Sequence, residues 1–245
     1  MSPHYPFPWR IGMALLWDVL HRFPRSFRED AVACTKLLSP QSKLLGKEYI
    51  PNSGPCLLAA NHYSRHGFAA WWIALGISAA VPAEIHWLMT AVWTHLGPLE
   101  PLTRWLFPHL ARAYGFTIMP PMPPDPRETK ARAQSVRQAL RYARQTTAPV
   151  IGLAPEGRDH PGGILAEPPS GVGRFIGKLM PHCKRITPIG VYEDDEYLCV
   201  NFGPAFQLET LPNLSADQRD FTISRQVMRA IARQLPIQLR GGYGS

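Results

Sequence analysis

The stretch CLLAANHYSRHG, residues 56–67, decides the fold. Its first five residues, Cys56–Ala60, form a continuous apolar run of strand length, and polar residues follow at once. Runs of this kind are typical of strands that are buried on both faces of a parallel sheet. His62 comes directly after the run, at the sheet edge where functional loops gather, and a histidine there can act as a general base near neutral pH. A simpler interpretation is that its ring only caps the next helix.

Similar apolar runs alternate with longer helical segments along the rest of the chain. The other expected strands are residues 85–89, 116–119, 150–154, 186–192 and 198–202. The expected helices are residues 68–75, 92–113, 127–145 and 172–180, then a last helix after Ser215, with Gln218 as its capping-box partner and an apolar face of Phe221, Val227, Met228 and Ile231. This alternation predicts an α/β fold, here a single domain with a mixed, mostly parallel sheet flanked by helices.

Residues 1–48 are expected to form a separate helical segment in front of an α/β domain of residues 49–245. Apolar residues repeat at helical spacing in this segment, namely Met13, Leu16, Leu20 and Phe23. The spacing predicts an N-terminal amphipathic helix. All seven tryptophans lie in the first 105 residues: Trp9, Trp17, Trp71, Trp72, Trp87, Trp93 and Trp105. Because tryptophan favours bilayer interfaces, this half of the chain either contacts a membrane or uses its rings to fill the core.

The chain is basic and moderately apolar. Hydrophobic residues make up 45% and charged residues 18% of the 245 residues, and the formal net charge is +8. A basic surface suits anionic lipid, phosphorylated ligands or nucleic acid, but no recognised nucleic-acid-binding module accompanies the charge, so we expect no nucleic-acid partner. No run is long and apolar enough to predict a transmembrane helix. We therefore expect a cytoplasmic protein that is peripheral on the membrane.

The cysteines and the basic residues give weaker signals. The four cysteines, Cys34, Cys56, Cys183 and Cys199, lack the spacing of metal ligands, so we expect no metal site and a reduced, intracellular setting. The N-terminus lacks the basic region of a signal peptide. Residues 127–144 contain six basic side chains and one acidic side chain, Glu128. That helix either attracts anionic lipid or the phosphates of coenzyme A, or simply exposes a solvated face.

A second polar segment, LAPEGRD at residues 153–159, also follows an expected strand and leads into a glycine-rich loop. It combines the carboxylate of Glu156 with the guanidinium of Arg158. Arginine presents a planar pair of donors that suits phosphate, so a strand-end loop of this kind can bind an anion. Taken alone, the segment is more typical of an exposed ion pair in a turn.

Together and in this order, the two segments resemble the motifs of the phospholipid/glycerol acyltransferase family, which includes the lysophosphatidic acid acyltransferases. Asn61, His62 and Ser64 match the family's first motif, N-H-x-S-x-x-D, and residues 155–157 match the Pro-Glu-Gly of its third motif, F-P-E-G-T-R-S. Weaker matches follow at residues 173–175, 187–191 and 200–204. The resemblance spans about residues 49–206.

The resemblance implies transfer of a fatty acyl group from acyl-CoA or acyl-carrier protein to the hydroxyl of a glycerolipid, without any cofactor besides that co-substrate. In the family, the histidine removes a proton from the acceptor alcohol as its oxygen attacks the thioester, and an aspartate orients the histidine. The resemblance thus makes His62 the general base. It implies that the substrate is bound by Asn61, Ser64, Glu156, Gly157 and Arg158.

Three departures from the family pattern bear on activity. Gly67 stands where the orienting aspartate is expected, and neutralising that aspartate in a serine protease costs about 10⁴ in rate. The second motif, at residues 115–120, ends in Pro120 where an arginine is expected. The third motif is one residue shorter than E-G-T-R, which moves Arg158. Asp159, on the loop expected to face His62, is the favoured substitute for the missing aspartate.

Several interpretations remain open at this point. Asp159 takes the orienting role, or His66 relays the proton instead. Alternatively, His62 works without an orienting group on an acceptor that lacks the usual phosphate. A further alternative is a catalytically inactive protein that binds lipid or acyl-CoA at a membrane surface. A hydrolase with Ser64 as nucleophile is weaker, because Ser64 does not lie in a G-x-S-x-G elbow.

Overall fold

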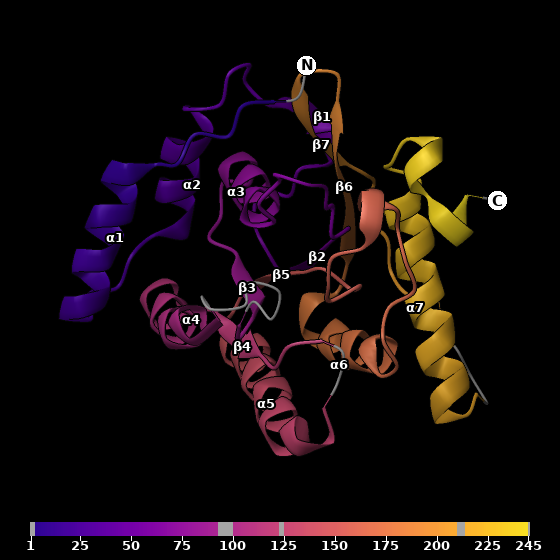
Figure 1. The fold of residues 1–245 in the computed structure, drawn as a ribbon. Helices are drawn as coiled ribbons and strands as arrows, with labels where there is room; N and C mark the ends of the chain where they lie inside the picture. Colours follow the sequence, from indigo (N-terminus) through magenta and orange to yellow (C-terminus); the bar gives the residue numbers. More distant parts are fainter. Residues whose placement is uncertain (1–2, 93–99, 123–124, 210–213, 245) are drawn as a thin grey trace.

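A computed structural model describes residues 3–92, 100–122, 125–209 and 214–244 (Figure 1). Its seven strands form one mixed sheet in the order β1-β7-β6-β2-β5-β3-β4. Neighbouring strands are parallel except for the antiparallel pair β6 and β7. The strands are β1 (Lys43–Leu45), β2 (Cys56–Ala60), β3 (His86–Thr90), β4 (Thr117–Met119), β5 (Val150–Leu153), β6 (Ile186–Asp194) and β7 (Tyr197–Phe202).

Helices cover both faces of this sheet. Figure 1 shows α2 and α3 on one face and α5, α6 and α7 on the other. The seven α-helices in the described ranges are α1 (Trp9–His21), α2 (Phe27–Thr35), α3 (Trp71–Ala80), α4 (Glu100–Tyr114), α5 (Thr129–Gln145), α6 (Val172–Cys183) and α7 (Ala216–Ala232). The expected α/β fold, a mostly parallel sheet flanked by helices, is confirmed.

The register of the central strands sets the position of the functional loops. β2 is the middle strand, and all five of its residues are buried. Ala59 pairs with Leu153 of β5, and Ala60 pairs with Ile189 of β6. Because β2 and β5 are parallel, their carboxyl ends meet at the same edge of the sheet. The loops that begin at Asn61 and at residue 154 therefore lie side by side.

Two elements were not expected from the sequence. β1 has only three residues and no apolar run, and α2 is a short helix that begins after the Ser26 cap, whose hydroxyl accepts from the Glu29 amide. β1 pairs with β7 although it lies before residue 49, so the sheet begins inside the segment that was expected to be separate. Lys43–Leu45 is thus part of the same sheet as the strands after residue 49.

The helix α7 confirms one prediction and corrects another. The Ser215 side chain accepts from the Gln218 amide, and Gln218 bonds back to the Ser215 amide, which completes the expected capping box. Phe221 was expected on the buried face, but it is 58% exposed. Val227, Met228 and Ile231 are buried as expected, and Ile223, four residues before Val227, adds to the same face.

The tryptophans divide between core and surface. Trp72 and Trp87 are buried, whereas Trp71 and Trp105 are partly exposed and Trp93 lies outside the described residues. The core interpretation is therefore right for Trp72 and Trp87. The expected helix 92–113 is observed as α4 from residue 100 onward, and residues 93–99 lie outside the described ranges.

The helix α1 leaves its apolar side chains uncovered. Figure 1 shows it at the periphery of the molecule, where it contacts α4. Its large apolar residues are between 48% and 72% exposed, namely Trp9, Met13, Leu16, Trp17 and Leu20. Val19 is the buried residue of this helix. Among the described residues, no helix is both long and apolar enough to cross a membrane.

Candidate functional site

His62 and Asp159 meet at the carboxyl edge of the sheet. His62 follows β2, Asp159 follows β5, and the His62 Nδ1 atom lies 2.8 Å from the Asp159 Oδ1 atom. Nδ1 is enclosed and makes no hydrogen bond of regular geometry, so the oxygen is at hydrogen-bond distance but away from the direction of the ring N–H. The two side chains are 24% and 41% exposed, which leaves the site open to solvent.

Asn61 fixes the end of β2 against β6. Its side-chain amide donates to the Val191 carbonyl at 2.8 Å, and its side-chain oxygen accepts from the Val191 amide at 2.7 Å. The residue is only 1% exposed. Both polar atoms of the side chain are therefore used inside the protein, which differs from the substrate contact expected from the sequence.

Glu156 holds the backbone of His62. One carboxylate oxygen accepts from the His62 amide at 2.6 Å and the other accepts from the Ala166 amide at 2.9 Å. Glu156 is 1% exposed, and burial raises the pKa of its carboxyl above the usual range. Each oxygen already has a backbone donor. Glu156 thus braces the loop that carries His62, where the sequence had predicted substrate binding.

The other three expected binding residues lie on the open side of the site. Ser64 is half-buried, and Gly157 and Arg158 are exposed. Gly157 has a φ of +68°, a left-handed conformation that favours glycine. Burial lowers the pKa of His160, and electrostatic interactions with Arg158 and with the His62 ring lower it further. His160 therefore adds a second imidazole close to His62, which the sequence had not singled out.

Gly67 lies beside the Arg65 side chain. It is exposed, its φ is +78°, and a Cβ atom at this position would lie 3.4 Å from Nη1 of Arg65. Any side chain at residue 67 would therefore meet Arg65.

Arg65 is instead held by Glu193 at the end of β6. The Arg65 Nη2 atom donates to Oε1 of Glu193 at 2.6 Å, and its Nε donates to Oε2. The hydroxyl groups of Tyr5 and Tyr63 donate to the same carboxylate at 2.7 and 3.2 Å. Nothing in the pattern of local sequence identifies this cluster, because Tyr5 and Glu193 are 188 residues apart.

The expected second motif lies at the edge of the sheet, where Thr117–Met119 forms β4 and Pro120 is buried. A guanidinium is nevertheless present, because Arg132 of α5 donates to the Pro121 carbonyl at 2.9 Å. It is tied to the connector after β4. The remaining basic residues of α5 are exposed, namely Lys130, Arg137, Arg141 and Arg144. Their exposure fits both interpretations of this helix, the solvated face and the attraction of anionic lipid or of the phosphates of coenzyme A.

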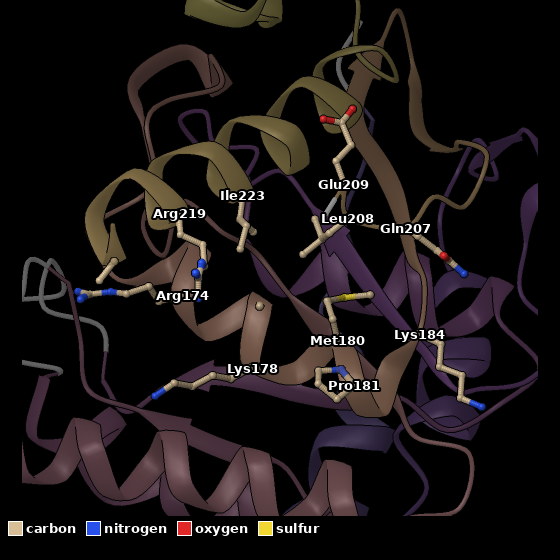
Figure 2. A pocket seen from close by; sticks show the side chains of 12 residues that line it. Arg174, Lys178, Met180, Pro181, Lys184, Gln207, Leu208, Glu209, Arg219 and Ile223 are labelled. Atoms are coloured by element: carbon tan, nitrogen blue, oxygen red, sulfur yellow. The ribbon is translucent and has the colours of Figure 1, made fainter. Parts of the chain in front are cut away.

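A hollow of about 660 Å³ lies between α6 and α7. Figure 2 shows Met180, Leu208 and Ile223 around its floor, with the charged ends of Arg174, Lys178 and Lys184 at its periphery. None of the residues that the sequence singled out for the reaction lines it. This hollow is therefore separate from the His62 site.

The described residues contain no group of three His, Cys, Asp or Glu side chains that could hold a metal ion. All four cysteines are buried and free. The chemistry available at the His62 site is thus that of an imidazole beside a carboxylate, with a guanidinium and a second imidazole close by.

No protein-family model matches the sequence, and no curated protein matches it either. Among solved structures, the fold is similar to that of the 1-acyl-sn-glycerophosphate (LPA) acyltransferase PlsC from Thermotoga maritima. The TM-score is 0.53, the sequences are 12% identical, and the match covers 84% of this chain and 76% of that chain. The chain therefore shares its α/β fold with this acyltransferase.

Proposed function

We propose that the protein is an acyltransferase that moves a fatty acyl group from acyl-CoA or acyl-carrier protein to the hydroxyl of a glycerolipid or related acceptor. The observation that carries the proposal is the 2.8 Å contact between His62 Nδ1 and Asp159 Oδ1. It supplies a base and a carboxylate at the functional edge of a sheet whose fold is similar to that of an LPA acyltransferase. Asp159 would take the role that Gly67 cannot fill.

The reaction follows from the two nitrogens of the His62 ring. With Nδ1 facing Asp159, Nε2 is the atom left to accept the proton of the acceptor hydroxyl. The acceptor oxygen forms a bond to the thioester carbonyl carbon, and the carbon–sulfur bond then breaks. The protonated imidazole gives its proton to the departing thiolate, so the products are an ester and a free thiol. Asp159 would stabilise the imidazolium between these steps.

The remaining residues divide into two roles in this proposal. Asn61 and Glu156 position the loop, because their polar atoms bond Val191, His62 and Ala166. Ser64, Gly157 and Arg158 lie on the open side and would contact the substrate. Arg158 would bind a phosphate of the acceptor, because its guanidinium is exposed and can form charge-assisted hydrogen bonds.

The membrane surface is the proposed location of the acceptor. The uncovered side chains of α1, among them Met13, Leu16 and Leu20, suit insertion into the interfacial region of a bilayer. The exposed cations of α5 and the net charge of +8 favour an anionic leaflet. The protein would thus act as a peripheral membrane protein.

One alternative has its own supporting observation. The Asp159 oxygen lies off the direction of the His62 N–H, and both Gly67 and Pro120 stand where the family pattern has functional side chains. These features favour an inactive acyltransferase-like protein that binds lipid or acyl-CoA. The enzyme would convert acyl donor and acceptor to products, whereas the inactive protein would bind its ligand without turnover.

The test is thiol release from acyl-CoA, or from acyl-carrier protein, in the presence of a panel of glycerolipid acceptors. Acceptor-dependent release that is lost in His62→Ala supports the enzyme, with His182→Ala as the matched control because His182 lies in the last turn of α6, outside the loops of the site. Transfer that survives His62→Ala would rule out the mechanism. Binding to vesicles without turnover on any acceptor would select the alternative.

A further inference from the structure

A buried cluster on the other side of the His62 loop joins three distant parts of the chain. It consists of Glu193, Arg65, Tyr63 and Tyr5, and we refer to it as the Glu193 cluster. Glu193 comes from β6, Arg65 and Tyr63 come from the His62 loop, and Tyr5 comes from the segment before α1. The Glu193 side chain is 8% exposed. Its carboxylate is bonded by all three partners.

The charges of the Glu193 cluster make it a rigid attachment. Burial opposes ionisation of Glu193, but the hydrogen bonds from Arg65 and Tyr5 outweigh it and lower the pKa of the carboxyl. Burial and the Glu193 charge raise the pKa of Tyr5 far above its usual range, so the hydroxyl stays protonated and keeps donating. Hydrogen bonds to a charged group are stronger than those between neutral groups. A charged carboxylate thus accepts four hydrogen bonds from three residues at physiological pH.

The cluster is coupled to His62 through the chain itself. Tyr63 follows His62 directly, and its ring packs so closely on Gly163 that a Cβ atom there would lie 2.5 Å from the Tyr63 Cδ2 atom. Phe68 joins the two tyrosines, with ring centroids 5.3 Å from Tyr5 and 5.2 Å from Tyr63. Glu156 holds the His62 amide from the other side. Glu156 therefore fixes the loop at His62, and Glu193 fixes it at Tyr63 and Arg65.

We propose that Glu193 and Tyr5 are positioning residues for the His62 reaction, acting through Arg65 and Tyr63. The inference rests on the proposed function. In this arrangement the conformation of the loop does not depend on an aspartate at residue 67, because Arg65 pairs with the carboxylate of Glu193 from β6. The N-terminal segment, which continues directly into α1, then completes the site with the Tyr5 hydroxyl.

The experiment compares Tyr5→Phe and Glu193→Gln with Tyr49→Phe, a control that removes a hydroxyl from an exposed tyrosine outside the cluster. We expect kcat to fall about tenfold or more in the first two variants, as losses of outer hydrogen bonds around a reactive group do, while KM for the acyl donor changes little. The ¹⁵N and ¹H resonances of the His62 ring should shift in the same variants. The control should leave both readouts unchanged.

The two readouts separate this inference from the proposed function. Unchanged kcat and unchanged His62 resonances in Tyr5→Phe, together with a lower melting temperature, would overturn it and leave the cluster a purely structural role. Shifted His62 resonances in a protein that transfers no acyl group would support the positioning and refute the proposed enzyme. If Glu193→Gln fails to fold, Tyr5→Phe still decides, because it removes a single hydroxyl.

Discussion

The Nδ1 atom of His62 and the Oδ1 atom of Asp159 lie 2.8 Å apart, although the two residues belong to loops that follow different strands. The contact forms because β2 and β5 are parallel neighbours in register, with Ala59 opposite Leu153. With a carboxylate beside its Nδ1 atom, the imidazole has Nε2 available for proton transfer.

Asp159→Asn should reduce acyl transfer strongly and leave KM for the acyl donor nearly unchanged. The substitution keeps the size of the side chain and removes the charge that stabilises the imidazolium, a change that costs up to about 10⁴ in kcat in a serine protease. Steady-state kinetics of thiol release measure the effect. The matched control is Asp195→Asn, at an exposed aspartate of the turn between β6 and β7. A kcat within twofold of the unmodified protein would remove Asp159 from the mechanism.

Gly67→Asp should not restore activity to Asp159→Asn. The new side chain would start 3.4 Å from the Arg65 guanidinium and pair with it, and a φ of +78° would strain the backbone by about 1 kcal/mol. Activity of the double variant and urea unfolding of Gly67→Asp alone check both statements. Recovery of transfer in the double variant would mean that residue 67 can reach His62.

Glu156→Gln should lower both stability and turnover. The carboxylate accepts from two backbone amides in a buried position, and a glutamine amide has only one acceptor oxygen, so one buried N–H loses its partner at a cost of about 1–3 kcal/mol. Denaturant unfolding measures the loss. Glu167→Gln, at the exposed residue that directly follows Ala166, is the comparison that should change little.

The unmodified protein and Glu156→Gln should also differ in how their free energy of unfolding depends on pH. The pKa of Glu156 is raised in the folded protein, mainly by burial, so the folded state binds the proton more tightly than the unfolded chain does. Its contribution to stability is then full below the unfolded value and falls as pH rises through the higher folded value. The difference in free energy of unfolding between the unmodified protein and Glu156→Gln should therefore shrink between about pH 4.5 and neutrality. A difference that grows with pH would contradict the assignment.

Arg158→Ala should raise KM for a phosphorylated acceptor and leave kcat nearly unchanged. Loss of a charge-assisted hydrogen bond of about 1.5–3 kcal/mol corresponds to roughly ten- to a hundredfold in KM. Kinetics with a phosphorylated acceptor and its dephosphorylated analogue separate phosphate binding from other effects, with Arg144→Ala as an exposed control on α5. Equal losses on both acceptors would show that Arg158 does not recognise the phosphate.

Charged substitutions on α1 should release the protein from vesicles. Leu16→Glu with Leu20→Glu removes two exposed apolar side chains, each worth about 1.5–3 kcal/mol when fully buried, so affinity for anionic vesicles should fall at least tenfold. Sedimentation with vesicles gives the partition. Gln134→Glu with Gln138→Glu, at exposed positions of α5, adds the same charge away from α1. Equal release by both pairs would reduce the effect to net charge alone.

Local sequence predicted the parts of this protein that depend on neighbouring residues. Continuous apolar runs predicted β2 and β5, and the Ser215–Gln218 pair predicted the start of α7, because strand burial and helix capping act over a few residues. The three-residue β1 was missed because its stability comes from pairing with β7. Phe221 lies on the same side of α7 as the buried Met228, seven residues further along, yet it is exposed near the start of the helix, because helical spacing does not say how far along a helix its packing partners extend.

The site shows the same division between local and long-range interactions. The sequence by itself identified His62, Glu156 and Asp159 as candidate site residues. It also predicted that they follow strands of a parallel sheet and therefore lie at one edge of it. Only the tertiary structure decided that Glu156 faces the His62 backbone while Asp159 faces its ring, and that Tyr5 reaches Glu193. Side-chain direction at a strand end depends on how the loops close and on what packs against them. Those contacts join residues far apart in the chain, and no local pattern records them.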